Sequence, residues 1–178
     1  AAGGGIDYSG MGVATEFEWH PKESRWAWGL KAGMATGDDK TTDNEYEGFV
    51  FDKNYDVAMI LFNHALGQAN VLHTQIAGVD ATSTTADPDV DAISNVTYAA
   101  PYFNFKYSDK WALHGVLATG WLDQTKLDST FDADNALGYE LDLSLNYTPN
   151  ERVVWQNTFG YFMTGAAYEA DGQFNTGD

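Results

Sequence analysis

Hydrophobic and polar residues alternate without exception over residues 139–147, with the apolar side chains at the odd positions. Successive side chains of a β-strand point to opposite faces of its sheet, so this period of two predicts a strand with one apolar and one polar face. Residues 11–20 and 26–35 repeat the pattern on either side of a turn at 21–24. The chain is therefore predicted to be all-β, with antiparallel strands.

The alternation predicts three hairpins, over about 7–37, 93–122 and 137–166. Their turns, at 21–24, 108–110 and 148–152, are short, and each carries a lysine or arginine. Long connections rich in Asp, Thr, Gly and Asn separate the hairpins, over 38–92 and 123–136. Short turns at one end of a sheet and long polar loops at the other are typical of outer-membrane barrels.

Tryptophan and tyrosine gather towards the ends of the predicted strands, whereas Leu, Val, Phe and Met fill the middle. Strands of roughly 10–13 residues are long enough to cross a bilayer, which takes ~9–11 tilted residues. Amphipathic rings at both edges of an apolar band would lie at lipid headgroups. The aromatic residues of this predicted girdle are Trp19, Trp26, Trp28, Tyr107, Trp111, Trp121, Tyr139, Tyr147, Trp155 and Tyr161.

Composition narrows the function classes. The 178 residues carry a formal charge of −17, with 26 acidic against 9 basic side chains, so nucleic acid is not an expected partner. There is no cysteine, which excludes disulfides, a thiolate nucleophile and Cys-ligated metal sites. The longest apolar run, 57–62, is far shorter than the ~20 residues of a membrane-spanning helix.

With these patterns the chain resembles a Gram-negative outer-membrane, porin-like β-barrel. The resemblance implies an antiparallel transmembrane β-barrel in the bacterial outer membrane, forming a water-filled or lipid-organising pore with no chemistry and no cofactor. Membrane lipid, lipopolysaccharide and further copies of the protein are the partners it implies. The stretch 47–57 also resembles ring-forming, porin-like proteins of predatory bacteria, whose oligomers enclose lipid.

Six strands are clear in the pattern, and single-chain bacterial barrels start at eight. An open sheet in lipid would leave unsatisfied backbone groups on both edges. We therefore expect residues 1–178 to be a segment of one longer barrel, with about six to eight strands here and further segments of the same barrel completing it. The alternative is that two more strands lie in the poorly patterned stretch 45–92.

The polar side chains at alternate positions of each strand are predicted to line the lumen. Four carboxylates against two lysines would give a wet channel a slight preference for cations, because rings of charge set selectivity. The alternative is that these groups are solvated or paired with one another. The predicted lumen-lining residues are Glu16, Glu18, Lys31, Lys106, His114, Glu140 and Asp142.

Residues 56–67 are predicted to form a short helix within the first long loop, because Asp56 can cap it and Gly67 can end it. Its apolar positions include Val57, Ile60, Leu61 and Phe62. Such a helix needs cover, either from the barrel wall on the inside or from a neighbouring protomer with trapped lipid. The few polar side chains in the segment favour association with a neighbour.

Two other function classes remain open, an outer-membrane lipid-modifying enzyme and a soluble β-sandwich binding protein. The four histidines lie in separate predicted elements, and no Gly-x-Ser-x-Gly or His-Glu-x-x-His motif occurs. No catalytic residue is therefore predicted. Spaced aspartates at 87–91 and 128–134 lack the pattern of a calcium loop, so no metal is predicted, although divalent bridging to lipopolysaccharide is a minority interpretation.

Overall fold

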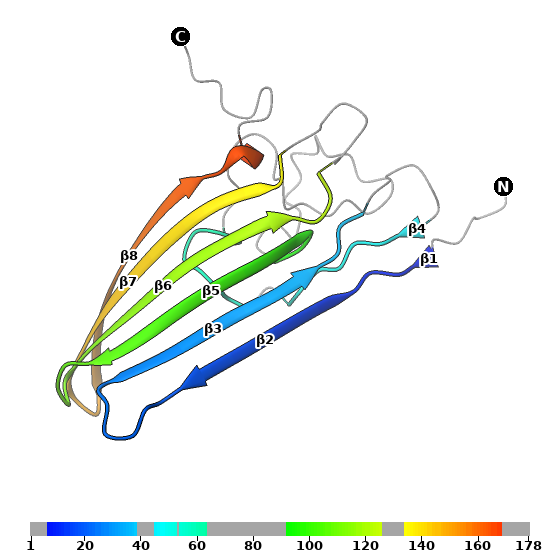
Figure 1. Cartoon of the computed structure of the whole chain (residues 1–178). Coiled ribbons are helices and arrows are strands. Elements are labelled where there is room, and N and C mark those ends of the chain that lie inside the picture. Colours follow the sequence, from blue (N-terminus) through cyan, green and yellow to red (C-terminus); the bar gives the residue numbers. More distant parts are fainter. Residues whose placement is uncertain (1–6, 39–44, 53, 64–91, 126–133, 169–178) are drawn as a thin grey trace, which may run out of the picture.

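The computed structural model describes residues 7–38, 45–52, 54–63, 92–125 and 134–168. Its main element is a six-stranded antiparallel sheet whose strands lie side by side in the order in which they occur along the chain (Figure 1). The predicted all-β class and the six strands are confirmed. The strands are β2 (Gly12–Trp19), β3 (Trp26–Ala35), β5 (Val96–Lys106), β6 (Trp111–Leu122), β7 (Ala136–Asn150) and β8 (Val153–Thr164).

Three shorter elements complete the described part. Strands β1 (Asp7–Tyr8) and β4 (Glu45–Tyr46) pair in parallel, so the start of the predicted first hairpin joins the long connection and not β3. The 3₁₀ turn η1 (Ala166–Tyr168) follows β8. Within the described ranges, no helix has the length and apolar character needed to span a membrane.

The three tight turns lie together at one end of the curved sheet, and the strand ends that lead into the long connections lie at the other (Figure 1). Side chains cap these turns: the Ser108 hydroxyl accepts the backbone N–H of Trp111 at 3.2 Å, and Asn150 accepts that of Arg152 at 3.0 Å. Among the described residues the sheet stays open, with β2 and β8 as its edges. Closure into a barrel therefore remains an expectation.

Side chains point to the two faces of the sheet as the alternation of apolar and polar residues predicts. In β7, Leu141, Leu143 and Leu145 are exposed, whereas Glu140, Asp142 and Ser144, which alternate with them, are buried. We call the leucine face the outer face and the opposite one the inner face. The usual arrangement of a soluble sheet, with its apolar face buried and its polar face in water, is thus inverted most clearly in β7, whereas β2 and β8 expose side chains of both faces.

The hydrophobic core lies on the inner face, towards the long connections. Side chains of β5, β6 and β7 form its floor, and Ile93 with the segments 55–62 and 167–168 covers them. Small and large residues alternate in this floor, as in Ala100 beside Tyr98. The core residues are Val57, Ala58, Leu61, Phe62, Ile93, Val96, Tyr98, Ala100, Ala118, Leu122, Leu137, Ala167 and Tyr168.

The predicted helix at 56–67 is wrong over residues 56–63, which form bends and a turn; residues 64–67 lie outside the described part. Phe62 has a φ of 77°, which a right-handed helix does not allow. The backbone N–H groups of Met59, Ile60 and Leu61 bond to carboxylates of β7 and not to carbonyls within a helix. The inner face of the same chain covers Leu61 and Phe62, so these two side chains need no neighbouring protomer as cover, and association itself stays a prediction.

Candidate functional site

A short segment, residues 56–63, crosses the inner face and is held from both sides; we call it the strap. At one end the Lys31 ammonium of β3 donates to the Asp56 carbonyl oxygen at 2.7 Å. At the other, Glu140 accepts the backbone N–H groups of Ile60 and Leu61 at 2.6 and 2.5 Å. Hydrogen bonds to a carboxylate are stronger than neutral ones, so β7 fixes the path of the strap.

The sheet provides a seat for the strap through small residues. Lys31 pairs in register with Ala100, and Ala118 pairs with Glu140, so two alanines lie between the cation and the carboxylate that grip the strap. Both alanines are fully buried. Because their methyl groups leave room above the sheet, the strap can approach closely enough for its backbone to reach Glu140.

A cavity of about 620 Å³ lies on the inner face between the strap and the tight turns. We call it the inner cavity. The strap contributes one wall through Met59 and Asn63, and β2, β3, β5, β6, β7 and β8 contribute the rest. Its polar lining includes Glu18, Lys31, Asn104, His114, Asp142 and Thr158. Four predicted lumen-lining residues therefore share one cavity.

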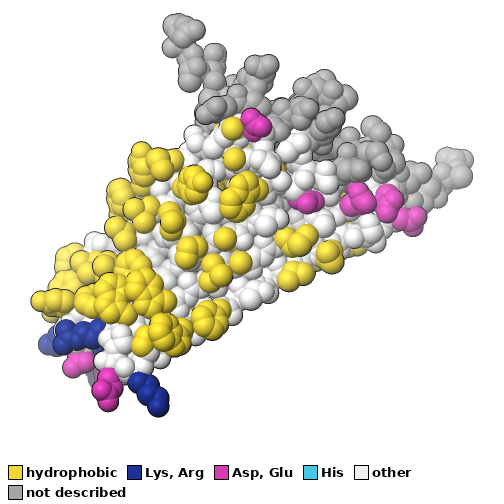
Figure 2. Space-filling model, viewed as in Figure 1, with side chains coloured by type: hydrophobic (Ala, Val, Ile, Leu, Met, Phe, Trp, Pro, Cys, Tyr) yellow, Lys and Arg dark blue, Asp and Glu magenta, His cyan; other side chains and the backbone are white. Residues whose placement is uncertain are grey.

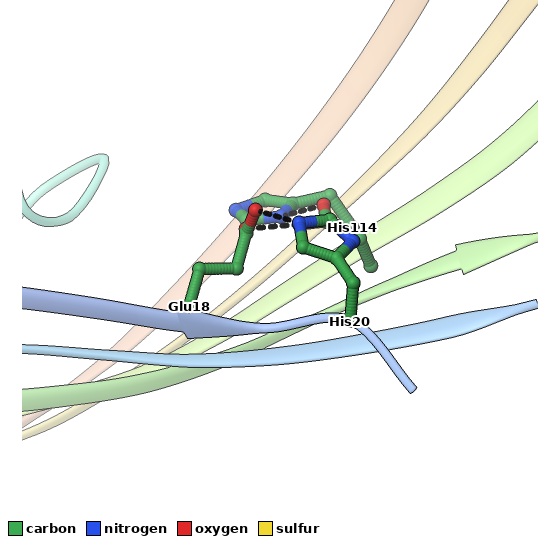
Figure 3. A network of polar contacts seen from close by, with 4 residues as sticks. Glu18, His20 and His114 are labelled. Carbon is green, nitrogen blue, oxygen red and sulfur yellow. Dashed lines mark hydrogen bonds and ion pairs between the residues drawn. The ribbon is translucent and has the colours of Figure 1, made fainter. Parts of the chain in front are cut away.

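A chain of hydrogen bonds orients the imidazole of His114 (Figure 3). The Asn104 amide donates to Glu18 at 3.1 Å, and its oxygen lies 2.8 Å from His114 Nδ1. Because that amide oxygen can only accept, Nδ1 carries the proton, and Nε2 of the neutral ring is an acceptor. His20 approaches Glu18 from the turn side at 2.5 Å.

The remaining predicted lumen residues are placed differently. Glu140 is fully buried beneath the strap, so it is a structural anchor and does not line open water. Glu16 lies on the edge strand β2 and pairs with Lys31 at 3.8 Å. Lys106 lies at the end of β5, where it pairs with Asp109 of the tight turn at 3.3 Å. These differences arise because the alternation predicts the face on which a side chain lies, but neither its position along the strand nor whether another segment covers it.

The predicted girdle residues lie on the outer face, and those near the tight turns contact one another. Trp26 and Trp28 stack with ring centroids 5.3 Å apart, and Trp111 stacks on Tyr147 at 4.3 Å. Figure 2 shows hydrophobic side chains spread over this face, with the charged side chains in view at its two ends. The aromatic residues thus frame an apolar band.

Sequence reasoning missed an aromatic cluster at the end with the long connections. Phe51, Tyr55 and Tyr98 follow one another with centroids 5.4 and 6.5 Å apart, and the Tyr98 hydroxyl donates to that of Tyr55 at 3.0 Å. Burial raises the pKa of the Tyr55 hydroxyl, and burial together with the charge of Glu140 raises the pKa of Tyr168. In the alternation of β5, Tyr98 occupies a position on the polar face. This placement was the one sequence signal that could have revealed the cluster.

Ser144 and Thr158, also missed, bring hydroxyl groups to the same face. Ser144 pairs in register with His114, but its hydroxyl bonds to that of Thr158 at 2.9 Å. A serine nucleophile needs its base within hydrogen-bond reach, so this arrangement offers polar binding groups more readily than acyl transfer. In the described part of the chain, no three carboxylate, histidine or cysteine side chains gather to hold a metal ion.

The chain matches no protein-family model and no curated protein. Its fold and the chemistry of its inner face are therefore the basis for a functional proposal.

Proposed function

We propose that this chain forms six adjacent strands in the wall of an outer-membrane, porin-like β-barrel, with the outer face in lipid and the inner face towards a water-filled lumen. The protein would act as a pore or an organiser of lipid, without chemistry of its own. Further strands beside β2 and β8 would complete the wall, because both edges carry backbone groups that lipid cannot satisfy.

The observation that carries this proposal is the inverted polarity of the sheet. Phe159 on the outer face is 61% exposed, while Glu140 on the inner face is fully buried. Water penalises a large, continuous apolar surface, and soluble monomers rarely expose one beyond a few hundred Å². Lipid removes that penalty, since hydrocarbon is the matching solvent for Leu, Phe and Val side chains.

The ends of the strands support the same proposal. Tyr139 and Tyr161 lie on the outer face near the long connections, and Trp26, Trp111 and Trp155 lie on it near the tight turns. An apolar band between two aromatic borders matches the layering of a bilayer, whose interfaces favour amphipathic rings. A soluble sheet covered by a second sheet has no reason to place its tryptophans in this way.

In this proposal the strap narrows the lumen at the end with the long connections. The side chains beneath it pack against one another, whereas the inner cavity lies between the strap and the tight turns. Glu18, Lys31, His114 and Asp142 would meet solutes in the inner cavity, and two carboxylates against one lysine favour cations.

Site-specific fluorescence tests the proposal directly. The chain contains no cysteine, so Leu143→Cys on the outer face and Gln156→Cys on the inner face each give a single site for a polarity-sensitive label. In phospholipid vesicles containing doxyl-lipids, we expect the label at 143 to shift to the blue and be quenched, and the label at 156 to remain in water. Equal emission and equal quenching at both positions would overturn the membrane proposal.

A further inference from the structure

Asp142 has one carboxylate oxygen that the strap uses and one that it does not. Oδ2 accepts the backbone N–H of Met59 at 2.9 Å. Oδ1 is buried, and the residue as a whole is only 5% exposed. Even so, Oδ1 has no hydrogen-bond partner among the described residues. A buried carboxylate oxygen without a donor costs free energy, so the site is poised to gain from a ligand that supplies one.

The structure closes tightly over this oxygen, which has almost no accessible surface. Gly160 of β8 pairs in register with Asp142, and a Cβ atom at Gly160 would lie 2.9 Å from Oδ1 and 3.0 Å from Met59 Sδ. The gap between the carboxylate and the strap is therefore too narrow even for a methyl group, and a ligand reaches Oδ1 only when the Met59 side chain moves aside. Met59 forms the movable side of that gap, because its side chain is unbranched and 45% exposed.

The surroundings define the chemistry of the ligand. Asp142 lines the inner cavity together with the hydroxyls of Ser144 and Thr158, which are acceptors as well as donors. Met59 and Val116 give the cavity an apolar wall. The nearest lysine of the cavity lining, Lys31, is directed to the Asp56 carbonyl and to Glu16, and these contacts leave Oδ1 unsatisfied.

We propose that Asp142 anchors a binding site for a small organic cation that carries a primary ammonium group and a short alkyl chain. The ammonium donates to Oδ1 and to the hydroxyls of Ser144 and Thr158, and the alkyl chain lies along Met59 and Val116. A hard divalent cation fits less well, because it takes six or more oxygen ligands. The net charge of −17 raises the concentration of cations around the protein as a whole.

The inference rests on the proposed function only in that water must reach the inner face. It is tested by calorimetric titration of n-butylammonium chloride into the full chain refolded in detergent micelles. Asp142→Asn can keep its oxygen on the Met59 N–H and place its amide in the position of Oδ1, so an acceptor becomes a donor. We expect at least tenfold weaker binding.

Two further variants keep the test sharp. Gly160→Ala leaves every charge in place but adds a methyl group beside Oδ1, and should also weaken binding at least tenfold. Glu16→Gln removes the same charge on the same face but outside the cavity lining, and should change the affinity less than twofold. Far-UV circular dichroism checks that each variant keeps its strands.

Several outcomes would overturn the site. These are no binding of n-butylammonium by the wild-type chain, unchanged affinity in Asp142→Asn with its strands intact, or an equal loss in Glu16→Gln. Equal binding of tetramethylammonium, which has no N–H donor, would do the same. A chain that binds n-butylammonium in micelles but places the label at 143 in water would refute the barrel and leave the site in place, so the two failures are distinguishable.

Discussion

The two faces of the sheet share the same strands and the same backbone ladder, yet they have opposite roles. Leu143 on the outer face is 36% exposed, and its neighbour Ser144 on the inner face is 6% exposed. The long-range hydrogen bonds and the packed core of the described chain are concentrated on the inner, more polar face. The comparison teaches that internal contacts stabilise one face, whereas the other depends on its solvent.

The inner face is itself divided. Towards the long connections, small residues such as Ala100 and Ala118 allow the strap to pack on the sheet. Towards the tight turns, Tyr102, Asn104 and His114 stand up from the sheet around the inner cavity. Side-chain size along β5 and β6 thus separates a sealed part of the face from an open part.

The largest effect is expected when the outer face receives a charge. For the protein inserted in lipid vesicles, Leu143→Arg should lower the free energy of unfolding by ~2–4 kcal/mol, because the guanidinium lies in hydrocarbon near mid-strand. Urea titration of the refolded protein measures the change. Gln156→Arg, on the exposed part of the inner face, is the control and should cost little. Equal costs for both variants would erase the contrast between the faces.

Removing the anchor of the strap should have the next largest effect. Glu140→Ala leaves the buried N–H groups of Ile60 and Leu61 without acceptors and should cost about 2–3 kcal/mol. Glu140→Gln keeps one acceptor and should cost about half as much. Ala58 is buried in the parent structure, so a cysteine introduced there by Ala58→Cys reports on the strap. Its thiol should react faster with a labelling reagent when Glu140→Ala is also present. An unchanged labelling rate would contradict the role of Glu140.

Enlarging the seat of the strap should have a moderate effect. Ala118→Leu adds three carbons to a fully buried position and should cost about 1–2 kcal/mol through overpacking. Ala32→Leu, on the outer face of β3, is the matched control and should be nearly neutral in vesicles. Unfolding curves of the two variants in the same lipid provide the comparison. A neutral Ala118→Leu would show that the strap does not pack as described.

The smallest effect is expected at the edge of the inner face. Glu16 is more than half exposed and its ion pair with Lys31 spans 3.8 Å, so Glu16→Gln should change the free energy of unfolding by less than about 0.5 kcal/mol. The comparison with Glu140→Gln tests how much burial matters for carboxylates of one face. A Glu16 effect as large as that of Glu140 would remove this gradient.

Much of the sheet could be predicted from the sequence. The alternation over 139–147 assigns Leu143 to one face and Ser144 to the other, because side-chain direction in a strand depends only on local parity. The turns at 21–24 and 108–110 are marked by Pro, Ser and charged residues, and the serines form hydrogen bonds within or next to their own turn through backbone and hydroxyl groups. Only the third turn is tighter than expected, since β7 extends to Asn150.

The strap and its site were decided by tertiary structure. The spacing of apolar residues over 56–67 predicts a helix from local sequence alone. In the folded chain, Glu140 and Asp142, 79 to 83 residues away, accept the backbone N–H groups that a helix would use. The free oxygen of Asp142 likewise depends on its register with Gly160. Local pattern determined the strands because their information lies within a few residues, whereas the path of the strap depends on partners that only the folded sheet brings into reach.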